Sequence, residues 1–287
     1  MTLPLRLSPD YRFLAIIGHP VEHSLSPLMH NVAFQTLGMH YLYASYDIEP
    51  ANLQDAVHDM KKHEFAGFNV TIPHKEAVIG FLDDLDFESK SVGAVNTVAV
   101  QNGRLVGYNT DVFGILKSLE PHKETLEGKK VLVIGSGGAA RAVLYALTKY
   151  FRPSEITVAA RSGEKAKSMV KSLKIANARV AGFALEPRTS GEFSLLVNAT
   201  PIGMFPESDA SPLPESYNVH DHQIVFDLIY RPLETKLLQR AREAGAKTIS
   251  GLEMFIHQGA KAFEIWTGEN MPLDEVRKAL KEKLKES

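Results

Sequence analysis

The stretch that decides the fold is "VLVIGSGGAARAVLYAL", residues 131–147. A short apolar run typical of a buried strand leads into Gly135, Gly137 and Gly138, and a helical pattern follows at once. Glycines permit a tight turn, and the first turn of a helix offers unpaired N–H groups to an anion. We therefore predict that residues 135–139, which include Ser136 and Ala139, bind the pyrophosphate of a dinucleotide. A glycine-rich turn without a ligand is the alternative.

The chain around this stretch alternates strand-like and helix-like segments up to about residue 250. The runs "EITVAA", "LLVNAT" and "IVFDLIY" are rich in Val, Ile and Leu and show no polar alternation. Such runs are typical of parallel strands that helices cover on both faces. Between them, "GEKAKSMVKSL" and "PLETKLLQRAREAG" have the pattern of helices. We predict an α/β dinucleotide-binding domain of the Rossmann type over residues 112–250.

The end of the next strand indicates which dinucleotide binds. An NAD site usually places an acid there for the ribose 2′-hydroxyl, whereas an NADP site uses arginine for the 2′-phosphate. Here "EITVAARSGEKA" ends in Ala160 and Arg161, followed by Ser162 and Lys165, and Glu164 falls in the start of the next helix. The pattern favours NADP, with a solvated loop arginine as the alternative.

The first third of the chain has a different pattern. We predict strands at 13–18, 41–48 and 65–72, a hairpin over 96–109 around an Asn-Gly turn, and helices at 26–38, 51–62 and 111–119. The first of these helices should have Ser26 as N-cap, Pro27 at its first position and Gly38 at its end. Two further helices, 252–268 and 272–286, follow the α/β segment and have no sheet of their own. They are expected to pack on a domain that is already built.

Composition limits the class of protein. Of 287 residues, 44% are apolar and 23% charged, and 32 basic against 34 acidic side chains leave a net charge of −2. This balance does not indicate a nucleic-acid surface. The chain has no cysteine, which excludes disulfides, thiolate metal sites and cysteine catalysis, and its histidines form no metal-ligand motif. No apolar run reaches the length of a membrane span. We expect a soluble, cytoplasmic protein without a catalytic metal.

Several polar motifs have no obvious structural purpose. In order, they and the glycine loop read "HSLSPLMHN", "NVTIPHKE", "GAVNTV", "GYNTD", "GSGGAARA", "NATPIGM", "DLIYRPLETKLL" and "GLEMFIHQGAKAFEIWTG". Together they resemble the shikimate dehydrogenase family over nearly the whole chain. The resemblance implies reversible, NADPH-dependent reduction of 3-dehydroshikimate to shikimate in aromatic amino acid biosynthesis. It also implies a substrate domain of residues 1–111 plus 251–287, with the Rossmann domain, 112–250, inserted between them.

The resemblance also implies roles for individual residues. Lys75 would be the acid–base group and Asp111 its partner, and Ser24 with Ser26 would bind the substrate carboxylate. The remaining implied substrate contacts are Thr71, Asn96, Tyr230 and Gln258. The implied cofactor contacts outside the glycine loop are Ala160, Arg161, Ser162, Lys165, Thr200, Leu228 and Gly251. Plainer alternatives exist: Ser26 and Asp111 could be helix caps, Asn96 a strand cap, and Lys75 with Asp111 a structural ion pair.

Two positions depart from the family pattern. Ala160 stands where many members have asparagine, which removes one polar contact to the cofactor, and His74 precedes the lysine where the family often has phenylalanine or leucine. We expect His74 at the rim of the site without a catalytic role.

Two other functions stay open: a quinate/shikimate dehydrogenase that uses NAD or NADP, and a non-catalytic NADP(H)-binding regulator. The partner is predicted to be a small molecule, and a homodimer is one alternative for the oligomeric state.

Overall fold

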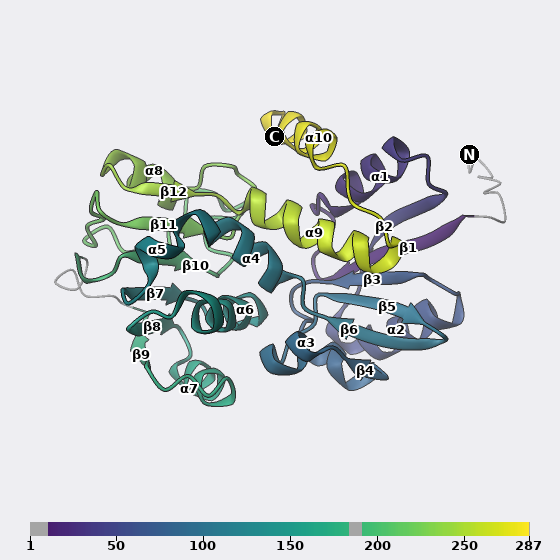
Figure 1. Ribbon diagram of the computed structural model, residues 1–287, viewed down its shortest axis with the longest axis horizontal. Helices are drawn as coiled ribbons and strands as arrows, with labels where there is room; N and C mark the ends of the chain where they lie inside the picture. Colours follow the sequence, from purple (N-terminus) through teal and green to yellow (C-terminus); the bar gives the residue numbers. More distant parts are fainter. Residues whose placement is uncertain (1–10, 184–190, 287) are drawn as a thin grey trace. The chain divides into compact units, whose positions relative to one another are not determined.

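The computed structural model describes residues 11–183 and 191–286 (Figure 1). They form two compact units. Unit 1 takes in the chain up to Lys90, together with Val95–Thr110 and Gly259–Glu286. Unit 2 takes in Ser91–Ala94 and Asp111–Gln258. Within the described residues, no helix combines the length and the apolar character needed to cross a membrane.

Unit 1 is built on a mixed six-stranded sheet in the order β2-β1-β3-β5-β6-β4. Its strands are β1 (Arg12–Gly18), β2 (Tyr41–Asp47), β3 (Gly67–Val70), β4 (Asp84–Leu85), β5 (Thr97–Gln101) and β6 (Arg104–Tyr108). The predicted hairpin is confirmed as β5 and β6, which pair antiparallel. Asn102 and Gly103 both have positive φ, as a two-residue hairpin turn of this kind requires. β3 is shorter than the predicted strand 65–72.

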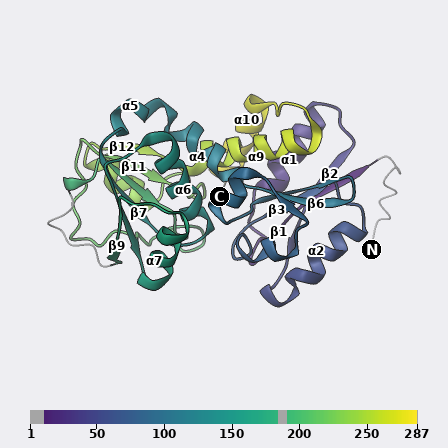
Figure 2. The same ribbon diagram turned by 60° about the horizontal axis from the view of Figure 1, so that its bottom comes forward.

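Helices cover both faces of this sheet. On one face, α2 (Leu53–Lys62) buries Leu53, Val57 and Met60 against β1 and β3. On the other face lie α1 (Ser26–Thr36) and the second half of α9 (Gly251–Thr267), whose Trp266 Nε1 donates to the carbonyl of Val98 at 2.9 Å. α10 (Leu273–Lys285) packs against α1. Figure 2 shows α2 on the side of the sheet opposite α1 and α9. The C-terminal helices therefore pack on the N-terminal sheet, as predicted.

Unit 2 contains a second six-stranded sheet in the order β12-β11-β10-β7-β8-β9. All its pairs are parallel, and its strands are β7 (Lys130–Ile134), β8 (Glu155–Ala160), β9 (Ala178–Gly182), β10 (Leu195–Asn198), β11 (Ile224–Asp227) and β12 (Lys247–Ile249). The chain winds outward from β7 in one direction and from β10 in the other. This is the predicted doubly wound order, and its direction changes between β7 and β10.

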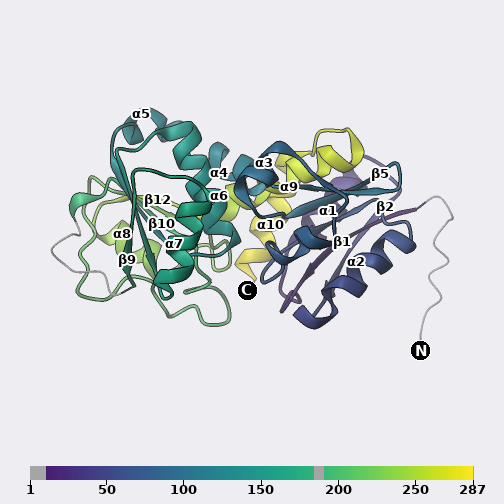
Figure 3. The same ribbon diagram turned by 90° about the horizontal axis from the view of Figure 1, so that it is seen from below.

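The helices of unit 2 lie on the two faces of its sheet. α4 (Asp111–Leu119), α5 (Lys123–Leu126), α6 (Gly138–Ala146) and α7 (Gly163–Ser172) contribute to one core. α8 (Lys236–Glu243) contributes Leu237, Leu238 and Ala241 to the core on the other face. Figure 3 shows α6 and α7 together on the first face. The predicted boundaries of α4 agree with the structure.

One detail of α1 differs from the sequence-based prediction. The N-cap is Leu25, and Ser26 is already the first helical residue, so the predicted Ser26 cap is wrong. The hydroxyl of Ser24 accepts a hydrogen bond from the backbone N–H of Ser26 at 3.2 Å. Pro27, predicted at the first helical position, is the second residue of the helix, and Gly38 follows the helix end with a positive φ.

Candidate active site

The glycine loop after β7 has the geometry that an anion site needs. Gly135 has a φ of +128°, and a Cβ there would lie 2.8 Å from the carbonyl oxygen of Ala199. Only glycine fits at this position. At Gly137, by contrast, a Cβ would meet no atom of the described residues within 4 Å, so this part of the structure leaves open space beside Gly137.

The N-cap of α6 is Gly137, which has no side chain of its own to offer. Among the residues that the structure describes, no side chain forms a capping hydrogen bond to this helix terminus. The neighbouring helix α7 differs, because Ser162 Oγ accepts from Lys165 N at 3.2 Å. Ser136, Gly138 and Ala139 are partly exposed beside the α6 terminus. An open loop and uncapped N–H groups at a helix terminus fit a pyrophosphate group.

The end of β8 presents a cation and no carboxylate. Ala160 is buried, whereas Arg161, Ser162 and Lys165 are exposed. Ser162 uses a lone pair to cap α7, and its hydroxyl hydrogen can still be donated. Glu164 pairs with Lys167 at 2.9 Å on the surface of α7. The guanidinium of Arg161 and the hydroxyl of Ser162 are donors that suit a phosphate monoester.

The remaining predicted cofactor residues follow β10 and β11 or begin α9. The N–H and the hydroxyl of Thr200 both donate to Asn198 Oδ1, at 3.0 and 2.7 Å. Leu228 directly follows β11 and is partly exposed. A Cβ on Gly251 would overlap the carbonyl of Leu228, so glycine is required where α9 begins. Thr200 and Leu228 thus lie at the carboxyl ends of β10 and β11, and Gly251 packs against Leu228.

In unit 1, the turn after β3 fixes the backbone of Lys75. The carbonyl of Lys75 accepts from Val95 N at 2.8 Å, and Thr71 N donates to the carbonyl of Ile17 at 2.9 Å. A Cβ on Gly18 would overlap the methyl group of Thr71, so β1 passes close to this turn. The side chains of Thr71 and Lys75 are partly exposed. The turn is therefore anchored through its backbone while its polar side chains stay accessible.

His74, the residue before the lysine, is not at the rim. It is buried, and its Nε2 lies 2.6 Å from the carbonyl oxygen of Ile48. Its own carbonyl accepts from Val78 N at 2.9 Å. The predicted rim position is wrong, because His74 is a buried anchor that ties the turn to the segment after β2.

Asn96 belongs to a buried network of amides and hydroxyls. Its Oδ1 accepts from Thr110 N at 2.7 Å, and its carbonyl accepts from Asn69 Nδ2 at 3.0 Å. Asn69 Oδ1 accepts in turn from the hydroxyl of Tyr43 at 2.6 Å. Thr110 directly precedes Asp111 in the chain. Asn96 therefore does more than cap one strand, because it links the segments of Asn69 and Thr110.

The predicted substrate residues of unit 2 gather around α9. The ring of Tyr230 stacks on Phe255 at 4.2 Å, and Gln258 Nε2 donates to the carbonyl of Phe255 at 2.9 Å. Asp111 is buried at the first position of α4. One turn later, a Cβ on Gly114 would lie 2.6 Å from the carbonyl of Met254 and 3.2 Å from Gln258 Cβ. This close packing brings the helix of Asp111 against that of Gln258.

The eight predicted substrate residues divide between the units. Unit 1 holds Ser24, Ser26, Thr71, Lys75 and Asn96, and unit 2 holds Asp111, Tyr230 and Gln258. Apart from Lys75 and Asp111, these side chains are neutral hydrogen-bonding groups, which suits a small polyhydroxylated substrate. Among the described residues, no cluster of histidine and acidic side chains could hold a metal ion.

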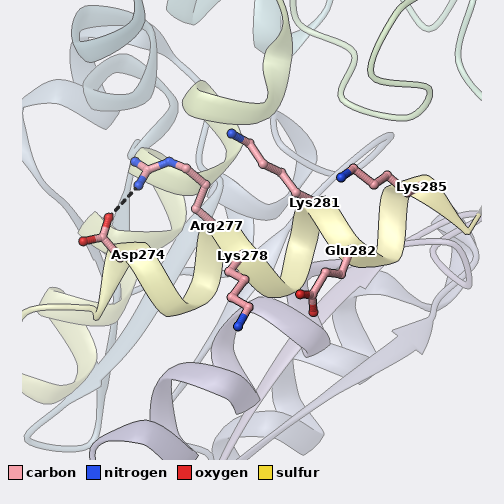
Figure 4. A pocket seen from close by; sticks show the side chains of 6 residues that line it. All are labelled: Asp274, Arg277, Lys278, Lys281, Glu282 and Lys285. Carbon is pink, nitrogen blue, oxygen red and sulfur yellow. Dashed lines mark hydrogen bonds and ion pairs between the residues drawn. The ribbon is translucent and has the colours of Figure 1, made fainter.

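A surface hollow lies elsewhere, along α10. Figure 4 shows Arg277, Lys281 and Lys285 on one side of this helix and Lys278 and Glu282 on the other. The sixth lining residue, Asp274, pairs with Arg277 at 3.0 Å. All six side chains come from one helix whose buried residues, Val276 and Leu280, face the other way. The hollow is the solvated face of α10, and none of the predicted site residues lies in it.

Several polar residues that organise these sites were not predicted from the sequence. Asn69, Tyr43 and Thr110 form the network around Asn96. Asn198 and Asp227 end two buried parallel strands and hydrogen-bond to each other at 3.0 Å. Both lie inside motifs already singled out, "NATPIGM" and "DLIYRPLETKLL". A polar residue that ends an apolar strand was the signal that could have found them.

Comparison with known proteins gives a consistent result. Family models match residues 16–98 (shikimate dehydrogenase substrate binding domain), 118–200 (shikimate / quinate 5-dehydrogenase) and 251–281 (shikimate 5'-dehydrogenase C-terminal domain). A shikimate dehydrogenase (NADP(+)) of Methanococcus maripaludis is 41% identical over 276 residues, which are 96% of this chain and 98% of that protein.

Solved structures agree with this comparison. A crystal structure of shikimate dehydrogenase in complex with NADP+ is similar over 97% of both chains, with a TM-score of 0.88 and 38% identity. The Thermus thermophilus shikimate 5-dehydrogenase in complex with NADP(H) and shikimate is similar over 94% of this chain and 99% of that one, with a TM-score of 0.82 and 37% identity.

Proposed function

The chain belongs to the shikimate dehydrogenase family, and from this premise we propose that Lys75 and Asp111 carry its acid–base chemistry. The chain is an NADP-dependent oxidoreductase that reduces 3-dehydroshikimate to shikimate, reversibly, in aromatic amino acid biosynthesis. The observation that carries this function is the full-length similarity to enzymes of that activity, together with the motifs of both units.

The substrate is a small carboxylate with several hydroxyl groups. We propose that the hydroxyls of Ser24 and Ser26 bind its carboxylate. Thr71, Asn96, Tyr230 and Gln258 would bind the ring hydroxyls, because each supplies a neutral donor or acceptor. Two bonds with Thr110 fix the amide plane of Asn96: Oδ1 accepts from Thr110 N at 2.7 Å, and Nδ2 donates to the Thr110 hydroxyl at 2.9 Å. The orientation of this amide is therefore set before substrate arrives. Unit 1 would thus hold most of the substrate contacts.

The cofactor residues are proposed from the loops of unit 2. Residues 135–139 would hold the pyrophosphate, and Ala160, Arg161, Ser162 and Lys165 the adenosine ribose with its 2′-phosphate. Thr200, Leu228 and Gly251 would hold the nicotinamide side. When bound, NADPH supplies the hydride for the reduction. The chain's own tasks are to orient the ketone, exclude water and deliver a proton.

Lys75 is the proposed proton donor. As an ammonium it would protonate the carbonyl oxygen of 3-dehydroshikimate as that oxygen gains negative charge, and in the reverse direction its neutral amine would take the hydroxyl proton. The backbone bond from Val95 N holds the turn that carries it. Asp111, buried at the start of α4, would orient the ammonium. The role of Lys75 is tested by substitution, as described in the Discussion.

A spectrophotometric assay tests the function against its alternatives. Reduction of NADP+ and of NAD+ is followed at the nicotinamide absorbance band, first with shikimate and then with quinate. We expect turnover with shikimate and NADP+ that exceeds every other combination. Faster turnover of quinate with NAD+ would assign the chain to the quinate-using branch. Binding of NADP(H) without any turnover would support the non-catalytic regulator.

Location and assembly are further proposals. We infer that the enzyme works in the cytoplasm, because a chain without cysteine has no disulfides to form in an oxidising compartment. We also propose a homodimer. Light scattering that gives the mass of one 31.7 kDa chain would contradict the dimer.

A further inference from the structure

A buried carboxylate joins the two loops that follow β10 and β11. Asp227, the last residue of β11, is completely buried, and the three residues before it are apolar. Its Oδ1 accepts from Asn198 Nδ2 at 3.0 Å and from Ile229 N at 3.1 Å, and its Oδ2 accepts from Thr235 Oγ1 at 2.7 Å. Burial raises the pKa of Asp227 to about 6, against the three hydrogen bonds that lower it. The group is therefore a carboxylate at neutral pH.

Asn198 transmits this anchor to the loop after β10. It is the register partner of Asp227 in the neighbouring strand. Its Oδ1 accepts from the N–H and the hydroxyl of Thr200, and its Nδ2 also donates to the carbonyl of Ile202 at 3.2 Å. The loop after β10 is thus wrapped around one amide group. That amide is oriented by Asp227, because a carboxylate can only accept and the NH2 end must face it.

The same loop touches the glycine loop. A Cβ on Gly135 would lie 2.8 Å from the carbonyl oxygen of Ala199 and 3.3 Å from Thr200 Cγ2. The backbone N–H of Ala199 donates to the carbonyl of Ile134 at 2.8 Å, so the start of the loop after β10 is held beside the glycine loop by a bond of its own. Hydrogen bonds run from Asp227 through Asn198 to Thr200, which directly follows Ala199 in the chain.

Asp227 also fixes both ends of the loop after β11. Ile229 N–H binds the carboxylate at the start of that loop, and Thr235 binds it at the end. Thr235 is the N-cap of α8, and its hydroxyl accepts from Leu238 N at 3.3 Å while it donates to Asp227. Tyr230, one of the proposed substrate residues, lies between Ile229 and Thr235 in the chain.

The strand order indicates which half of the cofactor these loops face. In a doubly wound sheet, a dinucleotide lies across the carboxyl ends of the strands, with its pyrophosphate at the first glycine loop. Arg161, proposed for the 2′-phosphate, follows β8 on one side of β7. The nicotinamide half of a bound cofactor would then lie at the ends of β10 and β11, which are on the opposite side of β7.

We propose that Asp227 is a positioning residue for hydride transfer, which holds the loops after β10 and β11 together around the nicotinamide half of NADP(H). The proposal rests on the NADP-dependent function above. Asp227 touches neither substrate nor cofactor in this role and acts through Asn198, Thr200 and Thr235. Its loss would misplace the reacting half of the cofactor while the pyrophosphate and 2′-phosphate contacts persist.

The test is Asp227→Asn in the full-length enzyme. The substitution replaces one carboxylate oxygen, which accepts, by an NH2 group, which donates. This NH2 group would face either the donors of Asn198 and Ile229 or the hydroxyl of Thr235, so at least one of the present hydrogen bonds is lost. We expect kcat for shikimate oxidation to fall about 10- to 100-fold, because small misplacements of reacting groups have effects of this size. The dissociation constant of NADP+ should change less than about threefold. Shikimate deuterated at the oxidised carbon should show a larger isotope effect on kcat than in the wild type.

Thr235 gives a second variant and a rescue. Thr235→Val removes one hydrogen bond to the carboxylate and should reproduce the loss of kcat in smaller measure, whereas Thr235→Ser keeps the hydroxyl and should restore most of it. Val276→Ala in the buried face of α10 serves as a control that loses stability by making a cavity far along the chain from these loops. Its kcat per folded molecule should equal that of the wild type.

The outcomes separate this proposal from the function on which it rests. A wild-type enzyme without shikimate-dependent reduction of NADP+ would overturn the proposed function. An active wild type together with an Asp227→Asn variant of unchanged kcat and isotope effect would overturn the role of Asp227. That role would equally be overturned if activity fell only in proportion to the unfolded fraction, as in Val276→Ala. Should Asp227→Asn not fold, the Thr235→Val and Thr235→Ser pair decides.

Discussion

Lys75 is the residue on which the proposed chemistry depends most directly. Lys75→Met removes the ammonium and keeps most of the aliphatic stem, and the backbone bond from Val95 can still form. Acid–base assistance is typically worth about 10²–10⁴-fold, so we expect kcat to fall by at least about 100-fold. The KM for shikimate and the melting temperature should change much less. Steady-state kinetics and a thermal scan measure all three.

The control for this variant is Lys90→Met. Lys90 also belongs to unit 1, but its side chain is exposed and pairs with Asp84 at 3.1 Å. Surface pairs of this kind contribute roughly 0–1 kcal/mol, so the control should keep both activity and stability. A Lys75→Met enzyme with near-normal kcat would reduce Lys75 to a substrate contact.

Arg161 should determine the choice between NADP and NAD. It is exposed at the end of β8, where it can reach a 2′-phosphate without a burial cost. A charge-assisted hydrogen bond is worth roughly 1.5–3 kcal/mol. Arg161→Ala should therefore weaken NADP+ binding about 10- to 100-fold and leave NAD+ binding nearly unchanged. Lys171→Ala, on the exposed side of α7, is the matched control. Equal losses for both cofactors would show that Arg161 supports the loop and not the phosphate.

At the scale of elements, the start of α1 links a local hydrogen bond to substrate recognition. Ser24 Oγ accepts from the N–H of Ser26, the first residue of the helix. Ser24→Ala should raise the KM for shikimate about tenfold or more, because it removes one proposed donor to a carboxylate. It should also cost about 1 kcal/mol of stability through the lost turn bond. Ser24→Thr, which keeps the hydroxyl, is the control. A loss of stability with an unchanged KM would leave Ser24 only its structural role.

The elements themselves were largely predictable, because each depends on nearby residues. The hairpin of β5 and β6 follows from Asn102 and Gly103, and the glycine loop follows from its strand and helix. The N-cap of α1 was mispredicted at Ser26, since a serine before an apolar run marks a helix start only to within a residue or two. His74 was mispredicted at the rim because its partner, the carbonyl of Ile48, lies 26 residues away. Local patterns do not report a bond of that separation.

At the scale of the whole molecule, the sequence predicted that the C-terminal helices join the N-terminal sheet, and Trp266 now shows how. Its indole N–H binds the carbonyl of Val98 in β5, and a Cβ on Gly67 would overlap its ring. The sequence could not predict the surroundings of His30, whose neighbours come from β2 and α9 as well as its own helix. His30 stacks on Tyr43 at 4.5 Å and lies 5.3 Å from Trp266. Such a cluster exists only once the chain has folded.

His30 makes unit 1 sensitive to acid. It is fully buried, and neither ring nitrogen has a hydrogen-bond partner among the described residues. Besides Tyr43 and Trp266, its ring neighbours are Phe34 and Phe263, and Nε2 faces the glycine of α9 at position 259. Burial lowers the pKa of His30 from 6.5 to about 3. Between these two values the unfolded chain binds a proton that the folded chain does not, so stability rises with pH and is complete above about pH 6.5.

We therefore expect His30→Leu to remove part of the acid sensitivity of unit 1. At pH 5, burial of His30 should make the unfolding free energy of the wild type about 2 kcal/mol lower than at pH 7. The reason is that pH 5 lies about 1.5 units below 6.5, and each pH unit is worth roughly 1.36 kcal/mol. Urea unfolding followed by tryptophan fluorescence measures this, because the chain has one tryptophan and Trp266 lies in unit 1. The unfolding free energy of the wild type minus that of His30→Leu should therefore be about 2 kcal/mol lower at pH 5 than at pH 7. The exposed His58→Gln should show no such shift. The prediction fails if the difference in unfolding free energy between wild type and His30→Leu stays constant with pH. His30 would then not be held neutral in the folded chain, and a bound water or proton must satisfy its ring.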